Sequence, residues 1–188
     1  FNAAALAIFL LMTSYYIMKA IRSSQFLEDF GPYYLLFTYY GNAVLTLFAV
    51  FAYNKVVERY ERKDIIDTVY GSIALLFASL WLLNLLQIYP RVITVVNFFT
   101  VCVYIVILTS LLWSLVHDVF APHEAKRLYG LILLAAQGGV FVGGQLTKFL
   151  APQVGTMNLI PVSLVFFGGT YLAVQRLERF KIRVSAKA

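Results

Sequence analysis

Six apolar stretches of about 20 residues run through this sequence, separated by short breaks that carry charges, glycine or proline. A helix of about 20 apolar residues crosses the roughly 30 Å hydrocarbon core of a bilayer. In lipid each spanning segment must satisfy its own backbone hydrogen bonds, which favours helices. The sequence therefore predicts an all-α integral membrane protein with six transmembrane helices. They are expected at about residues 3–26, 33–53, 65–88, 92–120, 128–150 and 157–174.

Composition excludes most soluble classes. Hydrophobic residues make up 61% of the chain and charged residues 13%, against roughly 45–50% apolar content in soluble domains. The net charge of +6 could suit nucleic acid, but basic flanks on membrane helices explain it better. Membrane lipids are therefore expected partners and nucleic acid is not.

The bases that flank the helices set the expected orientation. Eleven lie at one set of helix ends and four at the other, which places both termini in the cytoplasm. The first set is Lys55, Arg59, Arg62, Lys63, Lys126, Arg127, Arg176, Arg179, Lys181, Arg183 and Lys187, and the second is Lys19, Arg22, Arg91 and Lys148. Residues 1–176 are expected to form the transmembrane domain. Residues 177–188 are expected to be a basic cytoplasmic tail or linker.

Two proline-containing breaks mark helix boundaries. Gly31-Pro32 should end the first helix, and Ala121-Pro122 should end the fourth. Pro122 suits the first position of a new helix, because that position has no intrahelical N–H partner. Glu124 would then lie in the first turn, where the helix dipole favours negative charge.

Three residues of the first helix could bind an anion. The spacing of Tyr15, Lys19 and Arg22 places them on one helix face. Arg binds phosphate oxygens bidentately, Lys supplies a point charge, and an aromatic ring can stack on a base. Alternatively, both cations lie near the outer helix end and extend to the interface.

A second group lies where the fourth helix ends. Asp118 could pair with Arg127, Lys126 or a base of the 54–64 loop and so act as a gate. It could also carry a coupling proton together with His117, whose side chain titrates near neutral pH. The third interpretation is an interfacial residue in contact with water.

The fifth helix carries a packing motif. Gly139 and Gly143 have the GxxxG spacing that lets two helix backbones approach closely. We expect this face to pack against a neighbouring helix. Gln137 is expected to line a pore, because an amide needs hydrogen-bond partners in hydrocarbon.

Enzyme motifs are absent from the sequence. It has no Gly-x-Ser-x-Gly, no His-Glu-x-x-His and no Cys–His pair at useful spacing. Cys102 is the only cysteine, so neither an internal disulfide nor a cysteine-based metal site is expected. The sequence predicts no enzyme activity and no tightly bound cofactor.

The stretch SLLWSLVHDVF…AKRLYGLI resembles the end of the fourth helix, the loop and the fifth helix of the ATP/ADP exchange translocases. TSYYIMKAIRSS resembles their opening segment. The resemblance implies the N-terminal half of a major-facilitator-like fold. It also implies that Lys19 takes part in nucleotide binding. It also implies a bacterial inner membrane, or an organelle membrane. Ile105 stands where many relatives have Asn. The residues that match around the loop are Ser110, Trp113, Ser114, Asp118, Phe120, Lys126, Arg127, Tyr129 and Gly130.

Two functional hypotheses remain open. In the first, the chain is half of a secondary transporter that moves a nucleotide or other anionic metabolite by alternating access. Lys19 and Arg22 would bind the anion, and Tyr15 and Trp113 would form stacking or apolar walls. In the second, the chain is a non-transporting structural subunit of a larger membrane complex, and its partners are other membrane proteins in place of a second six-helix half.

Overall fold

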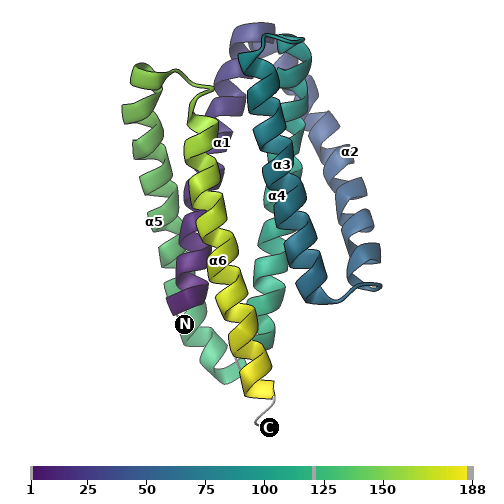
Figure 1. Ribbon diagram of the computed structural model, residues 1–188, viewed down its shortest axis with the longest axis vertical. Helices are drawn as coiled ribbons and strands as arrows, with labels where there is room; N and C mark the ends of the chain where they lie inside the picture. The colour runs from purple at the N-terminus through teal and green to yellow at the C-terminus, as the bar shows by residue number, and fades with distance from the viewer. Residues whose placement is uncertain (1, 120–121, 186–188) are drawn as a thin grey trace.

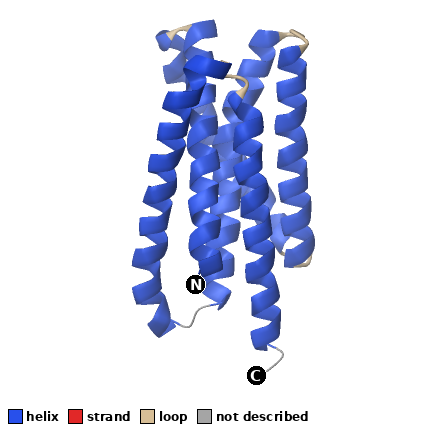
Figure 2. Cartoon of the chain, turned by 60° about the vertical axis from the view of Figure 1, so that its left-hand side comes forward, coloured by secondary structure: helices blue, strands red, loops and turns tan. Residues whose placement is uncertain are grey.

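In the computed structural model, residues 2–119 and 122–185 are described, and they form six α-helices and no strand (Figures 1 and 2). Side chains are described for residues 2–118 and 129–179. Every one of these six helices is long and apolar enough to cross a membrane, so the predicted all-helical class is confirmed. The helices are α1 (Asn2–Phe30), α2 (Pro32–Val57), α3 (Arg62–Leu85), α4 (Pro90–Val119), α5 (Pro122–Val154) and α6 (Leu159–Ser185).

The first predicted break has a clear backbone cause. Gly31 has a φ of 75°, a left-handed conformation that glycine adopts without a Cβ penalty. Its N–H bonds to the carbonyl oxygen of Leu27 at 3.0 Å, which closes α1. Pro32 then begins α2, and Pro122 likewise begins α5, as the sequence predicted.

Most helix ends differ by two or more residues from the expected positions. The first and second helices end four residues later than expected, at Phe30 and Val57. The third and fifth begin earlier than expected, at Arg62 and Pro122. The third helix ends at Leu85 instead of residue 88, because Gln87 and Tyr89 take φ values of 56° and 49°. The fifth continues to Val154, since Pro152 in the last turn removes only one helical hydrogen bond. The sixth runs to Ser185, so most of the expected tail at 177–188 is helical. Charged residues continue a helix readily beyond a membrane span.

The first helix lies at the centre of the bundle. It packs mainly against α5 and α6 and also against α4, and in Figure 1 it lies behind α6, between α5 and α4. The helices alternate in direction, so α1 begins and α6 ends at the same end of the bundle (Figure 1).

The two glycines of the GxxxG motif lie against α1. A Cβ at Gly139 would lie 2.3 Å from the carbonyl oxygen of Phe9, and one at Gly143 would lie 2.7 Å from that of Thr13. Thr13 also donates its hydroxyl to the carbonyl oxygen of Gly139, at 3.2 Å. The α1 and α5 backbones are therefore in direct contact, which only glycine permits at these positions.

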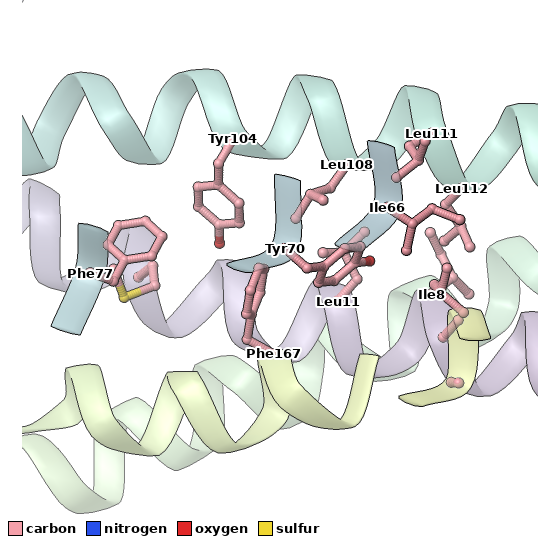
Figure 3. Close-up of a cluster of buried hydrophobic side chains, with 14 of the residues drawn as sticks. Ile8, Leu11, Ile66, Tyr70, Phe77, Tyr104, Leu108, Leu111, Leu112 and Phe167 are labelled. Atoms are coloured by element: carbon pink, nitrogen blue, oxygen red, sulfur yellow. The ribbon is translucent and has the colours of Figure 1, made fainter. Parts of the chain in front are cut away.

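A cluster of aromatic rings joins α3, α4 and α6. The Tyr70 and Phe167 ring centroids are 5.0 Å apart, and those of Phe77 and Tyr104 are 5.2 Å apart. Figure 3 shows these rings among the buried leucine and isoleucine side chains. The core of the bundle thus lies among α1, α3, α4 and α6.

The second helix is peripheral. Its main contacts are with α4, and among its residues only Thr38 is buried. It lies at the opposite side of the bundle from α5 (Figure 1). An apolar groove of about 680 Å³ separates it from α3 and α4, lined by residues such as Phe48, Leu76 and Phe99.

Candidate functional site

A line of polar contacts joins α1 to the antiparallel α4. Asp29 and Thr94 hydrogen-bond at 2.5 Å, and Gln25 and Asn97 at 3.4 Å. Further along, the Arg22 guanidinium contacts the Cys102 sulfur. The three α1 residues lie at i, i+3 and i+7, one face of a helix. We call these six residues the α1–α4 seam: Arg22, Gln25, Asp29, Thr94, Asn97 and Cys102.

Arg22 is held within the seam. Its guanidinium lies 4.7 Å from the Phe98 ring centroid, a cation–π contact, and its side chain is half-buried. Its Nε–H is buried and has no hydrogen-bond partner in the part of the chain that is described. Arg22 therefore faces α4 and retains one unsatisfied donor.

Lys19 lies one turn before Arg22 and is exposed. Its ammonium is 4.9 Å from the ring centroid of Tyr16. The Tyr15 ring contacts Tyr16 edge to face at 5.6 Å and reaches Tyr104 of α4 at 6.2 Å. Within residues 2–118 and 129–179, no carboxylate lies within ion-pair distance of Lys19 or Arg22. This part of α1 therefore presents positive charge beside aromatic rings.

Only part of the predicted binding set comes together. Tyr15, Lys19 and Arg22 are neighbours on α1, as expected from their spacing. Trp113 instead packs against His117 and Tyr129, with centroid distances of 6.3 and 5.5 Å. It lies nine residues beyond Tyr104, or about 14 Å along α4, so it does not share the contacts of Tyr15.

Gln137 lies apart from the seam, on α5. Its side chain is exposed, whereas Gly139, two residues on, is buried against α1. None of the hydrogen bonds among the described side chains involves Gln137. Its predicted role in lining a pore therefore stays a prediction.

A polar contact joins α3 and α4 at the end of the bundle where α6 ends. Arg62 forms an ion pair with Asp118 and donates to the Ser114 hydroxyl at 2.9 Å. Arg62 is one of the 54–64 loop bases that the sequence offered as partners of Asp118. The side chains of the other two candidates, Lys126 and Arg127, lie outside the described residues.

Sequence reasoning named Arg22 but not the polar contacts of the rest of the α1–α4 seam, and it missed a second network. The second network joins Asp67 of α3 to Tyr171 and Gln175 of α6. The i, i+3, i+7 spacing of Arg22, Gln25 and Asp29 was a usable signal for a polar face. No comparable signal existed for Asp67, because its partners lie more than 100 residues away.

The arrangement on α1 can hold an anion. An exposed ammonium beside aromatic rings offers charge and stacking to a phosphate-bearing ligand. No protein-family model, curated protein or solved structure matches this chain. Function is therefore inferred from the side chains themselves.

Proposed function

We propose that this chain is the N-terminal half of a secondary transporter that moves a nucleotide or another anionic metabolite by alternating access. The observation that carries the proposal is the exposed Lys19 ammonium beside Tyr16, with Arg22 one turn away. A charge within a membrane helix is costly, so it is usually retained for a function. No described carboxylate neutralises either cation, which leaves their charge available to an anion.

The two cations would have different roles. Lys19 would contact the phosphate directly as a mobile point charge. Arg22 is held by Cys102 and Phe98, so it would act mainly through its field, which is strong in apolar surroundings. Tyr15 and Tyr16 would form an aromatic wall for a base or another flat group.

The arrangement of the helices is compatible with one half of a larger bundle. Six-helix halves of major-facilitator transporters contain two three-helix units of inverted topology. Both α2 and α5 carry many exposed large apolar residues, including Tyr40, Phe48, Leu134 and Phe141. In our proposal a second half and lipid cover these surfaces.

The Arg62–Asp118 pair would hold the cytoplasmic side closed. It joins α3 to α4 with help from Ser114. In an alternating-access cycle, this contact would break and re-form as α4 moves. Lys126 and Arg127 lie near the start of α5 and would share this task.

Exchange measurements in liposomes test the proposal. The native polypeptide would be reconstituted and loaded with ADP, and uptake of labelled ATP would be followed. We expect Lys19→Ala to abolish most of the uptake. Lys148→Ala is the matched control, because Lys148 is an exposed lysine on α5, outside the seam. Wild-type uptake by Lys19→Ala would exclude an anion-binding role for Lys19.

A second candidate is a non-transporting subunit of a membrane complex. Two features favour this alternative: α2 has only one buried residue, and an apolar groove of about 680 Å³ lies beside it. The mass of the intact polypeptide from native membranes separates the two. A mass of about twice 21.3 kDa supports the single-chain transporter, whereas a mass of 21.3 kDa with crosslinks to foreign subunits supports the second candidate.

A further inference from the structure

A small charged pocket lies between α3 and α6, at the end of the bundle where α6 ends. Its volume is about 130 Å³. We call it the α3–α6 pocket. It is lined by Lys63, Ile66 and Asp67 of α3 and by Gln175, Glu178 and Arg179 of α6. It is separate from the α1–α4 seam and plays no part in the transport proposal.

Two carboxylates line this pocket, and one of them is fixed in place. The Tyr171 hydroxyl donates to Oδ1 of Asp67 at 3.0 Å, and the Gln175 amide lies 3.4 Å from the same oxygen. The Gln175 amide also lies 2.5 Å from the Tyr171 hydroxyl oxygen, so the three groups brace one another. The second carboxylate, Glu178, has a buried Oε2 with no hydrogen-bond partner among the described residues.

Two cations line the same pocket without pairing with these acids. Lys63 and Arg179 are exposed, and neither lies within ion-pair distance of a carboxylate in the described part of the chain. The pocket thus presents two positive and two negative groups that do not neutralise one another. A buried carboxylate oxygen without a partner costs free energy unless a ligand supplies a donor. A ligand with one positive and one negative group can pair with both the carboxylates and the cations of the pocket.

The surface of α6 next to the pocket favours a lipid over a soluble ligand. Val165, Leu172 and Arg179 are spaced by seven residues and therefore lie on one side of α6. Val165 and Leu172 are 74% and 59% exposed, so an apolar strip leads along the helix to the charged pocket. Acyl chains can lie on such a strip while the headgroup enters the pocket at the membrane interface.

We propose that the α3–α6 pocket binds a zwitterionic phospholipid with a primary ammonium headgroup, such as phosphatidylethanolamine. The phosphate contacts Lys63 and Arg179. The ammonium donates hydrogen bonds to Glu178 and Asp67. A phosphatidylcholine headgroup has no N–H to donate, and phosphatidylglycerol has no cation. The pocket therefore discriminates among these three lipids.

The first test uses the wild-type protein and varies only the lipid. The protein is reconstituted in nanodiscs, extracted in mild detergent, and its retained lipid is quantified by native mass spectrometry. We expect phosphatidylethanolamine to be retained roughly tenfold or more over phosphatidylcholine, the effect of losing one charge-assisted hydrogen bond. Mono- and dimethylated phosphatidylethanolamine should fall between them in order. Equal retention across the series would overturn the proposal.

Variants locate the site. Glu178→Gln and Asp67→Asn should remove the preference for phosphatidylethanolamine over phosphatidylcholine. Arg179→Gln should weaken retention of both lipids, because both have a phosphate. The matched controls are Asp64→Asn and Arg176→Gln, which change exposed charges three residues away on the same helices, outside the pocket lining. Glu178→Asp keeps the charge and should keep the preference.

Two results would contradict the proposal. If phosphatidylglycerol is retained best and Arg179→Gln is the only variant that changes retention, the pocket is a simple anion site. If free phosphoethanolamine displaces the lipid at equal concentration, the acyl strip on α6 contributes nothing and the ligand is a soluble one.

Discussion

The hydroxyl oxygens of Ser14 and Ser163 lie 2.8 Å apart, and each hydroxyl is also within reach of the other residue's backbone carbonyl, at 3.0 and 3.1 Å. Both side chains are almost completely buried. This reciprocal contact fixes α1 against α6 at the centre of the bundle. Small residues at this point also allow the two backbones to approach closely.

Replacing Ser14 tests both aspects of that contact. Ser14→Ala should lower the unfolding free energy by only about 0.6 kcal/mol, the average for interhelical hydrogen bonds in membranes. Ser14→Leu should cost more, about 1–3 kcal/mol, because it forces the helices apart. Unfolding by SDS titration in mixed micelles measures both. Ser110→Ala on the exposed side of α4 is the control, and a stable Ser14→Leu variant would contradict close packing here.

Substitution of Gly139 by alanine should destabilise the contact between α1 and α5. The new Cβ would lie 2.3 Å from the Phe9 carbonyl oxygen, so the helices must separate. We expect a cost of about 1–3 kcal/mol, typical of overpacking. Gly144→Ala should have little effect, since nothing lies within 4 Å of its added Cβ. Thermal unfolding in detergent compares the two, and equal melting temperatures would rule out the close approach.

Neutralising Arg62 should change stability only slightly. The side chains of Arg62 and Asp118 are 25% and 37% exposed, and exposed ion pairs contribute about 0–1 kcal/mol. Arg62→Gln should therefore lower the unfolding free energy by less than about 1 kcal/mol, and high salt should reduce the difference. Arg59→Gln, which alters an exposed base before α3, is the control. A loss of several kcal/mol would mean that the pair is structurally essential.

Cys102 should become reactive when Arg22 is removed. Cys102 is 6% exposed, and the Arg22 guanidinium lies against its sulfur. Maleimide labelling of the folded wild type should be slow. In Arg22→Ala it should be several-fold faster, whereas Lys19→Ala should leave it unchanged because Lys19 does not touch Cys102. Identical labelling of all three proteins would show that Arg22 does not shield the sulfur.

The number of helices and two of their boundaries were predictable from local sequence. Span length depends on a run of apolar residues, and the breaks at Gly31-Pro32 and Pro122 depend on backbone chemistry within a few residues. The end of α3 was harder to predict from the sequence, because Gln87 and Tyr89 adopt left-handed backbone conformations that nothing in their side chains requires.

Helix pairing was harder to predict. A membrane helix is apolar on all sides, so hydrophobic periodicity does not identify its buried face. The glycines of α5 were informative because they lack side chains and so indicate where two backbones can approach. The Asp67 network was missed because it depends on α3 and α6 meeting in three dimensions.

The central position of α1 has a consequence for biogenesis. Ser14 meets Ser163 across 149 residues of sequence, and Thr13 meets Gly139 across 126. At a synthesis rate of about 5–20 residues per second, the partner of Ser14 emerges roughly 7–30 s after Ser14 itself. During that interval the hydroxyls of Ser14 and Thr13 on α1 lack their partners on α6 and α5. Although α1 precedes α5 and α6 in the chain, it cannot be enclosed before they are made, and a ribosome stalled before α6 would leave it open to degradation.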